Sequence, residues 1–393
     1  MAKSQVIEPD PALIRQIRKA GGAELNKCYQ CATCSVVCNL SSEEHPFPRR
    51  EMLLAQWGQT DLLYKDPNVW LCYQCNDCTK HCPRGARPGD VLAAIRSFIY
   101  RSYSFPSFMG KAMATPKALP VLFLIPVLIL LACTIFTAPV DDNGEYIFMT
   151  SSTIDFDYFL PHKTVDVLFV FGMILIFILA SVGFTRFWKS IKTGGDEPKI
   201  SVVSAWVATI KEAFLHGNFN RCETNRPRMV GHMLLFAGFV GSMVVTGMVF
   251  ILIFVPHYLR DWQIFNIQIL PWPPIELPNP IKILGAVSGL ALVIGGAMLI
   301  IRRWQNRDEV GANGYADYLF LYIMFFVGLT GMLSWITRSY IGLPMLAYVN
   351  YFIHMVFVYF LLWYMPYSKF AHMIYRTLAI YYAKRTGREP RLA

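Results

Sequence analysis

Long apolar runs separated by short polar segments dominate the last two thirds of the sequence. Six runs have about the length that an α-helix needs to cross ~30 Å of hydrocarbon at ~1.5 Å per residue. They cover residues 119–139, 165–186, 230–254, 281–301, 317–337 and 348–367. Because lipid offers the backbone no hydrogen-bond partners, such runs predict transmembrane helices. We therefore expect a mainly α protein with a six-helix transmembrane cytochrome b-type bundle within residues 111–393.

The first 110 residues follow a different pattern, in which short helical segments flank groups of cysteines. Apolar residues recur at helical spacing over residues 11–19, 49–57 and 91–99. These segments are too short to cross a membrane. The pattern predicts a separate helical domain over residues 1–110, placed before the first membrane span.

The distribution of charge predicts how the spans are oriented. Lys and Arg gather after the second, fourth and sixth spans, whereas Asp and Glu gather in the alternate loops. By the positive-inside rule both termini then lie in the cytoplasm. The N-terminus lacks the apolar core of a secretory signal, which agrees with a cytoplasmic domain. We expect a multi-pass protein of the cell inner membrane, and the net charge of +10 reflects membrane orientation rather than nucleic-acid binding.

Two segments outside the spans have a pattern of their own. Residues 202–215 place Trp206, Ile210 and Phe214 on one helical face, which predicts either a helix along the membrane surface or a segment that docks the N-terminal domain. The proline-rich stretch 271–280 predicts a rigid lid on the outer side.

Eight of the ten cysteines form two runs of identical spacing. The runs are Cys28-x2-Cys31-x2-Cys34-x3-Cys38 and Cys72-x2-Cys75-x2-Cys78-x3-Cys82, of which only the second is followed by proline. This spacing is typical of two-cluster ferredoxins, in which the fourth cysteine of each run binds the other cluster. We therefore expect two [4Fe-4S] clusters. Cluster 1 would use Cys28, Cys31, Cys34 and Cys82, and cluster 2 would use Cys72, Cys75, Cys78 and Cys38.

Two other uses of these cysteines are less compatible with the sequence. Zinc sites usually combine two well-separated cysteine pairs, unlike four cysteines within eleven positions. Disulfides require an oxidising compartment, which a cytoplasmic domain does not occupy. The remaining cysteines, Cys133 and Cys222, are expected not to bind metal, and His81 is expected to tune a cluster.

Three histidines are candidates for haem binding because they lie in or beside apolar spans. His232 in the third span and His372 just after the sixth share one depth, which predicts an inner haem b held by two imidazoles. His354 lies eighteen residues before His372, and on one continuous helix both would share a face. It could bind an outer haem or belong to a quinone site, and Met243 is the nearest candidate for a second outer ligand.

These motifs resemble two known families. The runs CYQCATCSVVC and CYQCNDCTKHCP look like the HdrC type of heterodisulfide reductase subunit. The spans from about residue 165 to 372 resemble the HdrE and nitrate reductase gamma type of membrane cytochrome b. In the latter family four histidines bind two haems. His232, His354 and His372 match three of them, but Ser242 stands where the fourth would be.

The fusion of both parts in one chain resembles the QmoC type of membrane protein, found in the quinone-interacting membrane-bound oxidoreductase (Qmo) complexes of sulfate-reducing bacteria. That resemblance implies an electron-transfer subunit of a quinone-linked oxidoreductase. Its partners would be QmoA- and QmoB-like flavin and iron-sulfur proteins, its substrate menaquinone, and its final acceptor adenylylsulfate (APS) reductase.

Three other hypotheses remain. The chain could be the membrane subunit of a heterodisulfide reductase-type complex, or a non-redox anchor for an iron-sulfur enzyme, which would need no haem. A transporter should show internal repeats or broken polar helices, and the sequence shows neither clearly. The sequence also lacks a glycine-rich flavin fingerprint, which fits a chain that relays electrons to its partners.

Overall fold

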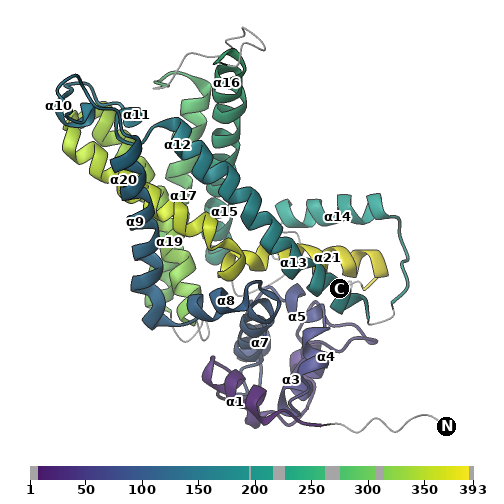
Figure 1. Ribbon diagram of the computed structural model, residues 1–393. Coiled ribbons are helices and arrows are strands. Elements are labelled where there is room, and N and C mark those ends of the chain that lie inside the picture. The colour runs from purple at the N-terminus through teal and green to yellow at the C-terminus, as the bar shows by residue number, and fades with distance from the viewer. Residues whose placement is uncertain (1–7, 194–195, 216–225, 262–274, 307–313, 389–393) are drawn as a thin grey trace.

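The computed structural model describes residues 8–193, 196–215, 226–261, 275–306 and 314–388. Within these ranges the chain consists of helices, turns and one isolated β-bridge, between Val140 and Tyr146. A small helical domain lies at one end of a bundle of long helices (Figure 1). The predicted fold class, mainly α, is confirmed.

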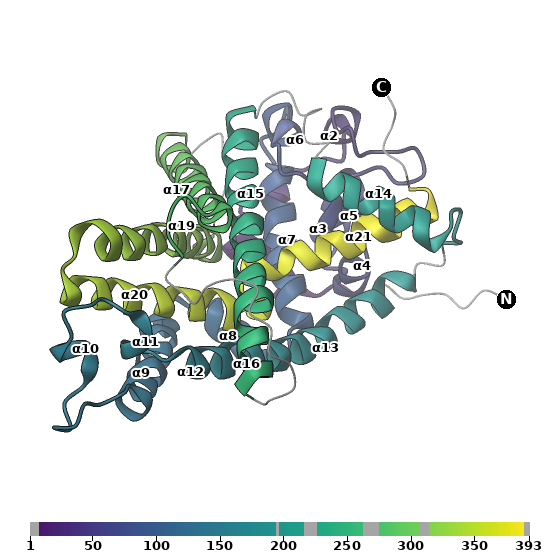
Figure 2. The ribbon, with the colours of Figure 1, turned by 90° about the horizontal axis from the view of Figure 1, so that it is seen from above.

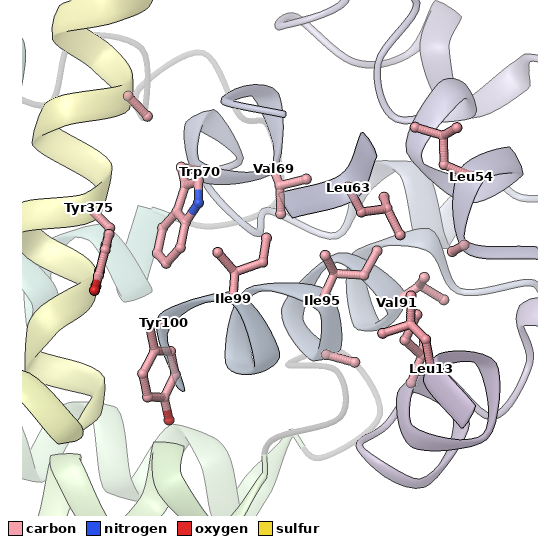
Figure 3. Close-up of a cluster of buried hydrophobic side chains, with 14 of the residues drawn as sticks. Leu13, Leu54, Leu63, Val69, Trp70, Val91, Ile95, Ile99, Tyr100 and Tyr375 are labelled. Atoms are coloured by element: carbon pink, nitrogen blue, oxygen red, sulfur yellow. The ribbon is translucent and has the colours of Figure 1, made fainter. Parts of the chain in front are cut away.

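The cysteine-rich domain contains seven of the described helices. These are α1 (Pro11–Lys19), α2 (Thr33–Val36), α3 (Arg49–Gln56), α4 (Thr60–Tyr64), α5 (Asn68–Leu71), α6 (Asp77–Lys80) and α7 (Pro88–Tyr103). Helix α1 begins after Asp10, whose carboxylate caps it by accepting a hydrogen bond from the Ala12 amide at 2.8 Å. Helix α7 buries Val91, Ile95 and Ile99 in the core of the domain, where they pack with residues of α1 and α3 (Figure 3).

Six helical stretches of the described chain are long and apolar enough to cross a membrane. They are Pro116–Thr137, His162–Lys192, Arg228–Asp261, Pro280–Gln305, Tyr315–Ile341 and Pro344–Trp363. Their helices are α9 (Leu119–Thr137), α12 (His162–Asp166) with α13 (Gly172–Lys192), α15 (Arg226–Val249) with α16 (Val255–Asp261), α17 (Pro280–Gln305), α19 (Tyr315–Ile336) and α20 (Pro344–Trp363). Short helices α10 (Ile147–Thr150) and α11 (Phe156–Phe159) connect the first two stretches. The number and order of the predicted spans are confirmed.

The long helices pack side by side in the order α15, α17, α19, α20 and α9 (Figure 2). Glycines allow α15 and α17 to approach each other closely. A Cβ atom on Gly295 would lie 2.7 Å from the Gly231 carbonyl oxygen, and one on Gly238 would lie 2.6 Å from the Leu292 amide nitrogen. Small residues at such contacts are how membrane helices gain packing energy in lipid.

The last span ends earlier than the apolar pattern predicts. Helix α20 stops at Trp363, and two 3₁₀ turns precede α21 (His372–Thr386), which runs at a steep angle to the bundle (Figure 1). Pro366 cannot donate a backbone hydrogen bond, and the Ser368 hydroxyl caps the next turn by accepting from the Phe370 amide at 3.1 Å. The expectation that His354 and His372 share one helix face is therefore wrong.

Helix α14 (Val202–Leu215) lies beside α21 rather than on the bundle (Figures 1 and 2). Its Thr209 is fully buried, and Trp206 stacks on Tyr381 of α21 with ring centroids 4.6 Å apart. The opposite face is apolar and exposed, with Val203 at 72%. Glu212 accepts a hydrogen bond from the Tyr73 hydroxyl of the second cysteine run. The segment therefore contacts the cysteine-rich domain, as one of the two predictions for it required.

Aromatic side chains join the cysteine-rich domain to the membrane helices. Trp70 of α5 stacks on Tyr375 of α21 with centroids 5.2 Å apart, as Figure 3 shows, and meets Phe187 of α13 edge-on at 5.7 Å. The Tyr103 hydroxyl at the end of α7 is hydrogen-bonded to the Ser190 hydroxyl of α13 at 2.7 Å. Trp70, Phe187 and Tyr375 are all nearly inaccessible to solvent, so the two parts share one core.

Candidate redox site

The two cysteine runs fold into loops with the same backbone conformation. In each loop the second and fourth residues after the first cysteine have positive φ: Gln30 at 60° and Ala32 at 67° in one, Gln74 at 52° and Asn76 at 70° in the other. This conformation is uncommon outside glycine. Alternation of this kind turns successive backbone N–H groups toward one point, and such nests bind anions and iron-sulfur clusters.

The structure brings the cysteines together across the two runs. Cys38 of the first run lines a single cavity with Cys72, Cys75 and Cys78 of the second. On the other side, Cys34 lies within electrostatic range of Cys28, Cys31 and Cys82. These are the two sets of four that the ferredoxin rule predicts, and their assignment as ligands stays a prediction.

The chemistry of the thiols fits a cationic centre in each set. Burial, followed by the neighbouring thiols, raises the pKa of Cys34 to about 11 and also raises the pKa of Cys78. A positive charge at the centre of each set would favour the thiolate forms of these two buried cysteines. No group of three or more His, Cys, Asp or Glu in the described ranges is arranged to hold a single metal ion. The spacing of the eight cysteines is the kind that binds [4Fe-4S] clusters.

Three arginine side chains donate hydrogen bonds to the loop of the second run. Arg376 of α21 donates to the carbonyl oxygens of Cys72 at 2.8 Å and Leu71 at 3.4 Å, and its guanidinium lies 4.2 Å from the centre of the Tyr73 ring. Arg228 of α15 donates to the Gln74 carbonyl. The third arginine is Arg96 of α7, which donates to the Gln74 side chain at 2.9 Å.

The predicted inner haem ligands lie on the same two membrane-domain elements. His232 is four residues after Arg228 on α15, and His372 is four residues before Arg376 on α21, so each pair is about one helical turn apart. His232 is also among the groups that act electrostatically on His372. The two histidines and the second cysteine loop therefore meet at one end of the bundle.

Hydrogen bonding orients the ring of His372. Its Nδ1 is paired with the carbonyl oxygen of Lys369, which can only accept, so Nδ1 carries the proton and Nε2 the lone pair. Burial, and next the charge of Lys369, lower the pKa of His372 to about 3. The ring is therefore neutral at pH 7 and presents Nε2, and metal-binding histidines are usually held in this way.

His354 lies deeper and faces a different helix. The Thr330 hydroxyl of α19 donates to the Phe326 carbonyl at 2.6 Å, so it accepts from His354 Nδ1–H at 3.1 Å and leaves Nε2 with its lone pair. Ser242 instead donates to the Gly238 carbonyl at 2.8 Å. Met243 lies on an exposed face of α15, with 45% of its surface accessible. The outer haem with Met243 as ligand stays a prediction.

Of the other singled-out residues, His81 directly precedes Cys82 and Cys133 lies in a membrane span, while others fall outside the described residues. Cys133 is on α9, and His81 ends α6. Cys222 and the first four residues of the proline-rich stretch fall outside the described ranges. The sequence analysis did not predict the three arginines that donate hydrogen bonds to the second cysteine loop. The only signal for them was the spacing of four between Arg228 and His232 and between His372 and Arg376, and nothing in the sequence marked Arg96.

Comparison with known proteins identifies both parts of the chain. Residues 24–86 match the 4Fe-4S dicluster domain, and residues 113–393 match the citrate utilization protein B family. Citrate utilization protein B of Escherichia coli is 25% identical over 93% of this chain and 92% of its own length. No solved structure matches the chain significantly.

Relatives of each separate part belong to redox complexes. An HdrC-like heterodisulfide reductase protein of Archaeoglobus profundus is 30% identical over 27% of this chain and 57% of its own length. The HdrE protein of the dihydromethanophenazine:CoB–CoM heterodisulfide reductase of Methanosarcina acetivorans is 27% identical over 54% of this chain and 86% of its own length. The predicted resemblance to the HdrC and HdrE types is confirmed.

The chain thus joins an HdrC-like iron-sulfur domain to an HdrE-like membrane part, as expected of a membrane electron-transfer subunit. Because the match over residues 113–393 covers more than half of its length, the protein belongs to the citrate utilization protein B family.

Proposed function

We propose that this chain is the membrane electron-transfer subunit of a quinone-linked oxidoreductase. It passes electrons between menaquinol or menaquinone in the membrane and soluble flavin and iron-sulfur partners. The cysteine-rich domain faces the cytoplasm, in agreement with the basic loops at that end of the bundle.

One observation carries the proposal. The helices that hold His232 and His372 also hold Arg228 and Arg376, two of the three arginines that donate to the second cysteine loop. A single pair of elements thus fixes both a candidate haem site and a candidate cluster site, at the junction of membrane and soluble domain. A simple anchor has no need of this convergence.

The residues of the chain have distinct tasks in this function. Haem and cubane centres, when bound, each carry one electron at a time, whereas a quinol gives up two. His232 and His372 would hold the inner haem, and His354 would hold an outer haem or orient the quinone. The eight cysteines of the two runs would hold the clusters. Apolar side chains around these groups exclude water from the junction.

The identity of the soluble partners separates two versions of the proposal. The resemblance to the QmoC type favours QmoA- and QmoB-like partners that deliver electrons to APS reductase in sulfate reduction. The match to citrate utilization protein B over nearly the whole chain favours a partner that acts on citrate or a related acid. Co-purification of the native complex, followed by assay with adenylylsulfate or with citrate, distinguishes the two.

The first test is the haem content of the purified full-length protein. We expect at least one haem b per chain by pyridine haemochrome, and reduction of both clusters by menadiol. His372→Ala should lose the inner haem and quinol-driven cluster reduction while keeping the non-haem iron and the sulfide of the clusters. His45→Ala, a histidine change in the soluble domain between the two cysteine runs, is the matched control and should keep both the haem and the cluster reduction.

Each result decides between the hypotheses. Absence of haem from the unsubstituted protein would favour the non-redox anchor. Unchanged haem in His372→Ala would refute the assignment of this ligand. A second haem per chain would require a partner for His354, and His354→Ala should then remove only that haem.

A further inference from the structure

We propose that Arg96, Arg228 and Arg376 give cluster 2, the cluster of the second cysteine loop, a higher reduction potential than cluster 1. They act as positioning residues for this loop and as a fixed positive field around it. The inference rests on the proposed function, because it takes the eight cysteines as ligands of two clusters.

The two loops are equivalent in backbone but differ in what supports them. In the first loop a neutral amide, Gln56 of α3, donates to the carbonyl oxygens of Cys28 at 2.9 Å and Leu25 at 3.2 Å. Gln56 also accepts a hydrogen bond from the Gln30 side chain at 3.2 Å. One uncharged side chain thus holds both the first carbonyl of the loop and its glutamine.

In the second loop, guanidinium groups make the corresponding contacts. Arg376 donates a hydrogen bond to the carbonyl oxygen of Cys72, which is the equivalent of Cys28. Arg96 donates a hydrogen bond to the side chain of Gln74, which is the equivalent of Gln30. Arg228 donates to the carbonyl oxygen of Gln74. Two of the three arginines come from the membrane domain, so a complete second loop requires that domain.

This difference in charge has an electrostatic consequence. Adding one electron makes a thiolate-bound cluster more negative by one charge, so nearby cations stabilise the reduced form and raise the potential. The three arginines lie at the partly buried domain junction, where solvent screening is weak. Two carboxylates oppose the three arginines: Glu212, which is bonded to Tyr73, and Asp77, which lines the cavity of the second loop, so the arginines exceed them by one charge.

The first loop also has basic neighbours, but they are exposed. Arg84 lies 4.2 Å from the centre of the Tyr29 ring, and Arg49 is near Cys31. Both arginines face solvent, where water and salt screen their charges. Their effect on potential should therefore be smaller than that of the arginines at the junction.

Unequal potentials would give the chain a direction. An electron shared between the clusters would reside mainly on cluster 2, beside His232 and His372. Cluster 1, whose Cys31 is exposed, would be the reducing end that meets the soluble partner. The arginines would thus set which end of the soluble domain holds the electron at rest.

The test is a redox titration of the purified full-length protein, followed by electron paramagnetic resonance. Cys38→Ser identifies the signal of cluster 2 by its loss, and this signal should titrate at the higher potential in the unsubstituted protein. Arg376→Gln should lower that potential alone, changing the ratio of reduced to oxidised cluster about tenfold, or ~59 mV for one electron. Arg376→Lys keeps the positive charge and should leave the potential of cluster 2 close to that of the unsubstituted protein. Arg84→Gln should shift the potential of neither cluster appreciably.

The proposal is overturned if the signal lost in Cys38→Ser has the lower potential, or if Arg376→Gln shifts neither signal or both equally. The first comparison needs no arginine variant, so a variant that fails to fold does not prevent a decision. Dithionite supplies the electrons, so the result does not depend on quinol oxidation. If menadiol fails to reduce the clusters of the unsubstituted protein while the two clusters still differ in potential as expected, the proposed function is refuted and this inference stands.

Discussion

Replacing Trp70 by alanine should weaken the docking of the cysteine-rich domain on the membrane helices. The indole is 1% exposed and lies between Tyr375 at 5.2 Å and Phe187 at 5.7 Å. Truncation of a buried tryptophan costs about 3–5 kcal/mol. Of this, each aromatic pair supplies about 0.5–1.5 kcal/mol beyond its buried area. Because both partner rings belong to the membrane part, much of the loss falls on docking.

Limited proteolysis of the full-length protein in detergent measures that loss. When opening is fast, the cleavage rate follows the population of the open form. A loss of ~3 kcal/mol then corresponds to roughly 100-fold faster cleavage between the two parts. Trp70→Phe retains a stacking ring and should increase the rate by less than half as much on a logarithmic scale.

Trp57→Ala is the matched control, because Trp57 is 48% exposed and ends α3. A surface change of this kind usually alters stability by no more than ~0.5 kcal/mol. Equal cleavage rates for Trp57→Ala and Trp70→Ala would refute the idea that Trp70 joins the two parts.

Three further predictions concern ligand assignment, helix packing and pH. Cys38→Ser should remove about half of the iron and spare the first cluster, whereas Cys133→Ser should leave iron content unchanged by colorimetric assay. Gly295→Leu should separate α15 from α17 and lower the thermal midpoint, because its Cβ would lie 2.7 Å from the Gly231 carbonyl oxygen; an unchanged midpoint and haem content would contradict the close packing. Burial, and next the adjacent Asp66, raise the pKa of Glu51 well above 4.5. The native state therefore keeps a proton that the unfolded state releases, so the free energy of unfolding should fall by up to ~1.4 kcal/mol per pH unit above pH 4.5. In Glu51→Gln, urea unfolding at pH 5 and pH 8 should show a weaker dependence, and an equal dependence would contradict the assignment.

Local patterns in the sequence were enough to predict the helices and the cysteine loops. The run from Cys28 to Cys38 encodes its loop by spacing, and the apolar runs encode the spans by length. Both signals lie within a few turns of chain, so no tertiary contact is needed to read them.

Features that depend on packing between distant segments could not be predicted in this way. The hydropathy of residues 348–367 continues past Trp363, yet Pro366 and the Ser368 cap end the helix. The partner of His354, Thr330, lies on another helix. The contact of Arg376 with Cys72 spans 304 positions, and neither residue marks the other in the sequence.

A short segment packed against the bundle connects the cysteine-rich domain to the first membrane span. Helix α7 ends at Tyr103 and α8 (Ser107–Met113) leads into the first span, while the Tyr367 hydroxyl donates to the Phe105 carbonyl at 2.9 Å. The relatives of the two parts match them separately, as shorter proteins. Two separate proteins must find each other by diffusion, whereas a tether replaces that encounter with a high local concentration. Because both parts belong to one chain, they always occur in equal number, and under the proposed function electron exchange between them would not depend on protein abundance.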